Sequence, residues 1–290
     1  MLLAAAVPPD RVSSRDIAIG LTGLALLRGV ISGPPERTRR RVEELRALVE
    51  ADDAGWTPIA AGELDPVAGY ALWAAAYDAP GNPLIAVEQP LVRALLDRTP
   101  AGRALDAACG TGRHAAHLAA AGHEVAGVDT SPDMLAVARR RLPHADLRQA
   151  SLEALPFADA SFDLAVCSLA LTHVPTLDVA IAELARVLRP GGRLVLSDVH
   201  PAFVAVLDGQ ARFGGGFVRN HVHLPSAYLA AFRRAGLDVV DCQEPVMGPE
   251  DAREEPLYTV APEAVAGAMV GLPYLLIWEA SRRPQPGALA

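Results

Sequence analysis

The residues best suited to do chemistry lie between Ala104 and Asp129, where an apolar run breaks into glycines and a second apolar run ends in a carboxylate. Gly110 and Gly112 allow a tight backbone turn and let a ligand approach closer than a Cβ atom permits. Asp129 follows Gly112 by 17 residues, a spacing at which a carboxylate can accept the hydroxyl protons of a ribose. Together these signals predict a site for a ligand that contains a nucleoside.

Four histidines are further candidates. His173 and His200 each follow an expected strand, where either could act as a general base or form a structural hydrogen bond. His221 and His223 alternate as the residues of a strand do, which would place both on one face. They could line a pocket or bind a metal ion, but no third ligand is evident, so no metal site is predicted.

Three aromatic residues, Tyr70, Trp73 and Tyr77, are spaced by three and four positions and should share one helix face. Such a stripe is usually part of a core. A contact with a bound ligand is the alternative, and it is strongest for Tyr77.

The composition excludes several function classes. With 51% hydrophobic and 21% charged residues, the chain of 290 residues is globular and can bury a large core. Its formal charge of −8 and the lack of a basic patch argue against a nucleic-acid partner. All 26 basic residues are arginines, which excludes a Schiff-base lysine and the lysine of a phosphate-binding loop.

Location in the cell is inferred from cysteines and apolar segments. The three cysteines have no paired spacing, which favours reduced thiols in a cytoplasmic protein. The apolar segment 17–31 contains Arg28 and is too short to span a bilayer, so no membrane partner is expected.

Helix signals dominate the first hundred residues. Two helices are expected from Ser13 to about residue 31 and from Pro34 to about residue 50, and a third helical stretch at 65–95 is interrupted by a turn at 79–83. The first helix is apolar nearly all round, so the domain, the second helix or a second subunit must cover it. Homo-oligomerisation through these helices is one hypothesis.

After residue 100 the pattern alternates regularly between strands and helices, which predicts right-handed crossovers and a parallel, doubly wound α/β sheet. The expected strands are 104–108, 124–128, 146–149, 162–169, 193–197, 237–240 and 275–280. The expected helices extend to residue 121 and over 132–141, 177–188 and 226–235. Ligands of such sheets bind beyond the carboxyl ends of the strands.

Three features separate this pattern from a dinucleotide site, whose fingerprint the run from Gly110 to Ala115 also satisfies. Asp106 lies inside the first strand, about 100 residues precede that strand, and the segment LRPGGRLVLSD follows later. Together they resemble the class I S-adenosylmethionine-dependent methyltransferases, including small-molecule enzymes of the ubiquinone-methyltransferase type, over residues 70–280. The resemblance implies a Rossmann-like, doubly wound seven-stranded sheet, mostly parallel with an antiparallel last strand, plus an N-terminal helical cap.

The resemblance also implies S-adenosylmethionine as the cofactor and S-adenosylhomocysteine as its product. The residues that it assigns to the cofactor are Asp106, Gly110, Gly112, Asp129, Thr130, Met134, Ser151, Leu152, Ser168 and Tyr77. Ser151 departs from the family, where an aspartate is usual, so the adenine amino group would meet a hydroxyl. Arg113 could meet the cofactor carboxylate, and an aromatic face such as that of Tyr77 suits a sulfonium. The catalytic candidates are His173, His200 and Tyr77.

The expected organisation is a helical annex and lid at 1–80, a methyltransferase domain at 81–283 and a tail at 284–290. Insertions near 201–223 and 244–274 should build the acceptor pocket. We interpret them as aromatic and poor in acids, which favours transfer of a methyl group to O, N or an electron-rich C of an apolar or aromatic small molecule, such as a secondary metabolite. The alternatives are an inactive cofactor-binding protein and an NAD-dependent oxidoreductase, whose common short-chain form needs a lysine.

Overall fold

A seven-stranded sheet forms the centre of the computed structural model, which describes residues 11–52, 56–60, 62–79, 82–207, 209–213, 216–259 and 261–284. The expected tail beyond residue 284 lies outside the described residues. The strands run in the order β11-β12-β8-β7-β4-β5-β6, and all neighbours are parallel except that β12 is antiparallel to β8 and β11. Their bounds are β4 Arg103–Ala107, β5 Glu124–Asp129, β6 Asp146–Gln149, β7 Phe162–Ser168, β8 Leu188–Val199, β11 Leu237–Gln243 and β12 Leu275–Arg282.

This sheet confirms the predicted doubly wound α/β fold with its antiparallel last strand. The chain proceeds outward from the central strand β4 through β5 and β6, then crosses back to β7 on the other side of β4. The order therefore reverses between β4 and β7, which is where a doubly wound sheet opens a crevice at the carboxyl ends of its strands.

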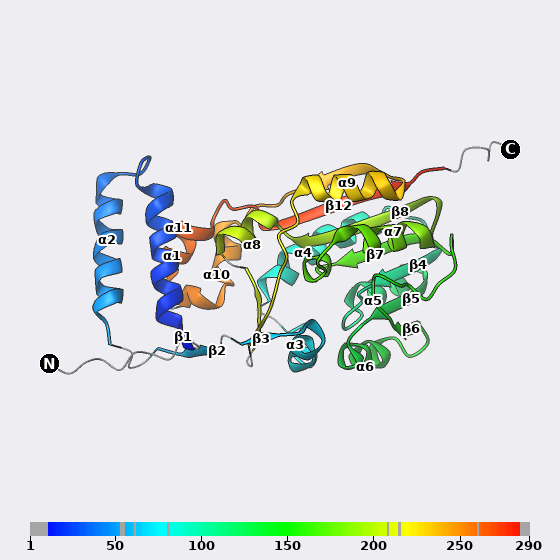
Figure 1. The fold of residues 1–290 in the computed structure, drawn as a ribbon, viewed down its shortest axis with the longest axis horizontal. Coiled ribbons are helices and arrows are strands. Elements are labelled where there is room, and N and C mark those ends of the chain that lie inside the picture. The colour runs from blue at the N-terminus through cyan, green and yellow to red at the C-terminus, as the bar shows by residue number, and fades with distance from the viewer. Residues whose placement is uncertain are drawn as a thin grey trace.

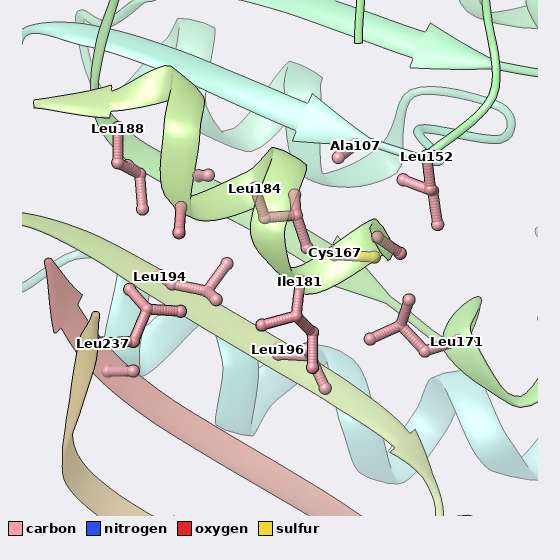
Figure 2. Close-up of a cluster of buried hydrophobic side chains, with 14 of the residues drawn as sticks. Ala107, Leu152, Cys167, Leu171, Ile181, Leu184, Leu188, Leu194, Leu196 and Leu237 are labelled. Atoms are coloured by element: carbon pink, nitrogen blue, oxygen red, sulfur yellow. The ribbon is translucent and has the colours of Figure 1, made fainter. Parts of the chain in front are cut away.

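Helices cover both faces of the sheet. The helices between the strands are α4 Pro83–Leu96, α5 Arg113–Ala120, α6 Pro132–Arg141, α7 Leu177–Val187 and α9 Pro225–Ala235. Local sequence sets their limits, because the side chains of Asn82 and Ser131 cap α4 and α6, and Gly236 ends α9 with a φ of 73°. Figure 2 shows the core under α7, where Ile181 and Leu184 lie over Leu194 and Leu196 of β8.

The first two helices form a hairpin at one end of the molecule. In Figure 1, α1 (Ser14–Gly29) and α2 (Pro35–Glu50) stand beyond α11 (Pro262–Met269), away from the large sheet. A capping box between Ser13 and Asp16 starts α1, as predicted. Since α11 and α2 both pack against α1, two elements of this chain cover it, while homo-oligomerisation stays a prediction. None of the described helices is long and apolar enough to cross a membrane.

The N-terminal segment and the first insertion meet in a small sheet, β3-β10-β9. It joins β3 (Glu63–Leu64) to β10 (Gly216–Val218) in parallel and β10 to β9 (Ala211–Phe213) in antiparallel fashion. The remaining elements are β1 Arg11–Ser13, β2 Pro58–Ala60, α3 Pro66–Trp73, η1 Leu171–His173, α8 Pro201–Leu207, α10 Pro249–Arg253 and η2 Pro256–Thr259. The strand expected around His221 and His223 is wrong, because residues 219–224 are irregular, although the two rings lie 6.0 Å apart.

Candidate active site

A cavity of about 200 Å³ lies at the carboxyl ends of β4, β5 and β7, where the crevice was expected. It is lined by most of the residues that the sequence assigned to a cofactor, namely Gly110, Asp129, Thr130, Met134, Ser151, Leu152, Ser168 and Tyr77, and by the catalytic candidate His173. Two assigned residues, Asp106 and Gly112, do not line it. The sequence therefore located the cavity but overstated which side chains face it.

The glycine turn between β4 and α5 explains those two exceptions. Gly110, with a φ of 53°, has open space where a Cβ atom would stand, so its backbone is accessible from the cavity. Gly112, with a φ of 79°, faces the other way, since a Cβ there would lie 3.2 Å from that of Ala138. Asp106 is buried beneath the turn and accepts a hydrogen bond of 2.8 Å from the backbone N–H of Ala115. Burial raises the pKa of Asp106 to about 7. Asp106 thus holds the start of α5 in place and does not line the cavity.

Asp129 ends β5 with its carboxylate held by the backbone. One oxygen accepts a hydrogen bond of 2.8 Å from the N–H of Gly110, and the other accepts one of 2.8 Å from the N–H of Ser131. Burial raises the pKa of Asp129, although these bonds oppose the shift. Each oxygen keeps a lone pair for a further donor, so the carboxylate can accept the two hydroxyl protons of a ribose.

Two residues without a glycine's freedom adopt the left-handed backbone conformation beside the cavity. Ala108 follows β4 with a φ of 60°, and Leu169 follows β7 with a φ of 53°. Both line the cavity. Such conformations cost free energy and occur most often at functional sites, where surrounding structure enforces them. No sequence signal marked either residue.

The polar groups deeper in the cavity differ in how well they are satisfied. The hydroxyl of Ser151 already accepts a hydrogen bond of 3.2 Å from the N–H of Glu153. The hydroxyl of Ser168 is buried and, within the part of the chain that the structure describes, has no hydrogen-bond partner. A buried polar atom without a partner is costly, and it is satisfied if a bound ligand supplies one.

Residues 66–79, which comprise α3 and the turn after it, cover the cavity and are called the covering segment below. Tyr70 and Tyr77 pack edge to face with ring centroids 6.1 Å apart, and Trp73 packs on Tyr77 at 5.2 Å, so the predicted aromatic stripe is brought together. Since α3 ends at Trp73, Tyr77 belongs to the following turn and not to the same helix. Residues 14–50 line neither cavity, so within the helical annex and lid expected at 1–80 the residues that line a cavity are Pro66, Tyr70, Trp73 and Tyr77.

Asp78 fastens this covering segment to the domain. Its carboxylate accepts hydrogen bonds from the hydroxyl of Thr111, at 2.9 and 2.8 Å, and from Arg141 of α6 at 2.6 Å. The segment is thereby tied both to the glycine turn and to the helix behind Asp129. Sequence reasoning missed Asp78, because an acid in a turn gives no sign of a partner so far along the chain.

His173 is the titratable base at the edge of the cavity. Its Nε2 lies 2.7 Å from the hydroxyl of Tyr70, and its Nδ1 lies 3.3 Å from the carbonyl oxygen of Arg219. When Nδ1 carries the proton and donates to that carbonyl, Nε2 accepts from Tyr70. Burial lowers the pKa of His173, although the bond to Arg219 opposes the shift, so the imidazole is neutral at pH 7.

The short helix that carries His173 rests on Asp198, which sequence reasoning also missed. Asp198 is buried at the end of β8 and accepts hydrogen bonds from Thr172 and, at 3.0 Å, from the hydroxyl of Tyr228. Burial raises its pKa to about 7. An acid closing a buried strand, in the run SDVH, was the available signal.

His200 and Arg113 do not occupy the positions predicted for them. His200 lines neither cavity, and its Nε2 lies 2.9 Å from Glu244. Arg113 is buried and donates a hydrogen bond of 2.6 Å to Glu88, a fully buried residue of α4. Both side chains form hydrogen bonds with glutamates of the protein, so neither is placed to contact a ligand.

A second cavity of about 210 Å³ adjoins the first. Tyr70, Tyr77, Leu169 and His173 line both, so these four residues form the boundary between the cavities. The interpretation of the insertions as poor in acids is wrong for the lining of this second cavity, because Glu255 of the insertion 244–274 lines it. Within the described residues, no group of three or more His, Cys, Asp or Glu could hold a metal ion.

Comparison with known proteins adds independent findings. Residues 105–196 match a family model described as a methyltransferase domain. A demethylmenaquinone methyltransferase of Renibacterium salmoninarum is 44% identical over 105 residues, which are 36% of this chain and 44% of that protein. The methyltransferase GfsG of Streptomyces halstedii is 34% identical over 159 residues, which are 50% of this chain and 56% of that protein.

The chain thus spans about half the length of the curated relatives that it matches. Among solved structures, an S-adenosylmethionine dependent methyltransferase from Mesorhizobium loti superposes with a TM-score of 0.53 at 28% identity. That match covers 67% of this chain and 97% of the other. Its extent agrees with a shared domain that this chain extends with further segments.

Proposed function

We propose that the chain is a class I S-adenosylmethionine-dependent methyltransferase, which transfers a methyl group from S-adenosylmethionine to an O, N or electron-rich C atom of a small molecule. The match of residues 105–196 to a methyltransferase domain and the similarity to the Mesorhizobium loti structure support this proposal. The observation that carries the proposal is Asp129, whose carboxylate is fixed by two backbone N–H groups at the rim of the first cavity. An NAD-dependent oxidoreductase gains no support from the relatives.

The residues of the first cavity fit the cofactor. The open space at Gly110 admits close backbone contact, Asp129 offers two acceptors to a ribose, and the hydroxyl of Ser168 has no partner among the residues that the structure describes. When bound, the cofactor supplies an electrophilic methyl group on a sulfonium. The chain then has to align the acceptor with that methyl group and exclude water, and positioning of this kind can contribute about 7–11 kcal/mol to catalysis.

The second cavity is our proposal for the acceptor site, because it shares its boundary residues with the first. One relative is named for the methylation of demethylmenaquinone, and GfsG is a methyltransferase of a Streptomyces. These names support a small-molecule acceptor.

The free cysteines support a cytoplasmic setting. A sedimentation measurement would test homo-oligomerisation through α1 and α2.

We propose that proton removal from the acceptor passes through the hydroxyl of Tyr70, which lines both cavities. The oxygen of Tyr70 takes the proton of the acceptor while its own proton moves to Nε2 of His173, whose Nδ1 is held by the carbonyl of Arg219. The neutral imidazole is the form that can accept a proton, and burial favours that form. His200 is withdrawn from this role, since it lines neither cavity.

Calorimetric titration with S-adenosylhomocysteine tests the cofactor site. Asp129→Ala should weaken binding by about tenfold to a hundredfold or more, since charge-assisted hydrogen bonds to the ribose are lost. Asp133→Ala, an exposed acid in the first turn of α6, is the matched control and should bind as the wild type does. Equal affinity of the wild type and Asp129→Ala would refute the assigned role of Asp129, and stabilisation by NADH instead of S-adenosylhomocysteine would refute the proposed cofactor.

A further inference from the structure

Two hydrogen-bond acceptors of residues that line the second cavity are not fully satisfied by the described residues. One is the carboxylate of Glu255 at the start of η2, and the other is the amide oxygen of Asn220, which follows β10. They come from the two insertions, 244–274 and 201–223, and both line the same space.

Glu255 is a half-buried carboxylate without a counter-charge. Its side chain accepts a hydrogen bond of 3.3 Å from the hydroxyl of Tyr274, and no arginine or histidine of the described residues forms an ion pair with it. Burial raises the pKa of Glu255, which is the response of a carboxylate that lacks a cation. Among the buried carboxylates, Glu88 is paired with Arg113, and Asp106 and Asp198 are held by hydrogen bonds from the protein. Glu255 differs from all three because it lines the second cavity.

Asn220 supplies the second acceptor, and its orientation is fixed. Its side-chain nitrogen donates to the carbonyl of Gly209, which identifies the other atom as the oxygen. That oxygen is buried and has no partner among the described residues, while Asn220 as a whole is 7% exposed. An unsatisfied buried amide oxygen of this kind is uncommon in a folded protein and is relieved by a ligand that donates a hydrogen bond.

Aromatic rings complete the lining around these acceptors. Phe203 and Tyr274 pack edge to face with centroids 4.8 Å apart, and Trp73 contributes a third ring from the covering segment. The faces of aromatic rings attract cations, and more so where water is excluded. A carboxylate, an amide oxygen and aromatic walls together match one chemical group better than any other, namely an ammonium with N–H donors.

We propose that the second cavity binds a small molecule through a primary or secondary ammonium group, with Glu255 as the counter-ion and the amide oxygen of Asn220 as an additional acceptor. This inference rests on the proposed function, because it gives the acceptor of methyl transfer a chemical class. It narrows the apolar or aromatic acceptor expected from the sequence to one that also carries a positive charge.

The test uses two probes of equal size on the full chain saturated with S-adenosylhomocysteine. The probes are 2-phenylethylammonium and its neutral counterpart 2-phenylethanol, and binding is followed by calorimetry and saturation-transfer NMR. The wild type should bind the ammonium at least about tenfold more tightly than the alcohol, because only the ammonium pairs with the carboxylate. Equal affinities, or no ammonium binding at millimolar concentration, would overturn the proposal.

Variants locate the effect in the cavity. Glu255→Gln keeps the size of the side chain and an oxygen for Tyr274 but removes the charge, so it should abolish the preference for the ammonium and leave alcohol binding unchanged. Glu250→Gln, a neighbouring exposed glutamate paired with Arg253, is the control and should keep the preference. An unaltered preference in Glu255→Gln would refute the role of Glu255.

The same samples separate this inference from the proposed function. Affinity for S-adenosylhomocysteine is measured first, in the wild type and in both variants, and should be equal in all three because Glu255 does not line the first cavity. Loss of that binding in the wild type would contradict the proposed function. Intact cofactor binding without ammonium preference would contradict the present inference alone.

Discussion

At the scale of single residues, the most informative atom is the hydroxyl oxygen of Ser168, a residue that lines the first cavity; this oxygen is buried and has no partner in the described part of the chain. We expect Ser168→Ala to stabilise the ligand-free protein by about 1 kcal/mol, because an unsatisfied polar group is removed. The same change should weaken S-adenosylhomocysteine binding, because the ligand loses a partner. Urea unfolding and calorimetry measure the two effects.

The control for this prediction is a serine whose hydroxyl is already satisfied. Ser161 donates a hydrogen bond of 2.7 Å to the carbonyl of Ala158 and lines neither cavity. Ser161→Ala should lower stability slightly and leave ligand affinity unchanged. If Ser168→Ala behaved in the same way, a ligand role for its hydroxyl would be contradicted.

The pair of Tyr70 and His173 makes a prediction about pH. Burial lowers the pKa of His173 below its ordinary value of 6.5, so its NMR titration should have a midpoint below 6.5, and activity should fall with protonation only below that pH. In Tyr70→Phe the hydrogen bond to the neutral ring is lost, so the midpoint should rise toward 6.5. The resonance is identified by its disappearance in His173→Asn. A midpoint above 6.5 in the wild type would contradict the assignment of His173 as a neutral base.

Residues such as Asp129 could be predicted, because a local motif encodes both the turn and the acid. Asp198 and Asp78 could not, since their roles depend on partners distant in sequence, Tyr228 and Thr111. His200 shows the converse. Its position after a strand was foreseen, but Glu244 from another segment turns its ring into a structural contact.

At the scale of elements, the contact between α1 and α11 depends on a glycine. A Cβ added to Gly267 would lie 2.9 Å from that of Ala25, which is closer than two helices tolerate. Gly267→Ala should therefore push α1 outward and lower the melting temperature. Gly20→Ala, on the open side of α1 with no atom within 4 Å, should stabilise the protein by about 0.5–1 kcal/mol. Thermal unfolding of both variants compares the signs, and stabilisation by Gly267→Ala would contradict the close packing.

The covering segment gives a second prediction at this scale. Asp78→Asn weakens its attachment to Thr111 and Arg141, so hydrogen exchange in residues 66–79 should speed up and S-adenosylhomocysteine affinity should fall several-fold. Asp178→Asn breaks an exposed ion pair with Arg234 and should change neither quantity. Unchanged exchange in Asp78→Asn would show that Asp78 does not secure the segment.

The boundaries of regular elements followed from local signals. Ser13, Asn82, Ser131 and Gly236 start or end helices within a residue or two of the positions expected. The segment 201–223 was harder, because β10 pairs not only with its neighbour β9 but also with β3, which lies about 150 residues earlier in the chain. A strand stabilised by a distant partner leaves little periodicity in its own sequence.

At the scale of the whole molecule, the doubly wound sheet was predictable because every strand and crossover repeats the same pattern over a long stretch. The placement of the α1–α2 hairpin was not. The apolar sequence of α1 predicts that the helix is covered but does not predict which element covers it. Here α11, an element near the other end of the chain, packs against α1. The hairpin consequently stands at the end of the molecule, apart from the site (Figure 1).

The small sheet β3-β10-β9 connects the segment leading into α3 with the insertion that supplies Asn220. Backbone hydrogen bonds make these two pieces a single flap, so neither can lift without the other. Because Asn220 lines the second cavity and Tyr70 of α3 lines both, a molecule bound in the second cavity should hold this flap in place and slow the release of S-adenosylhomocysteine from the first. Pre-steady-state release rates with and without such a molecule would reveal this dependence.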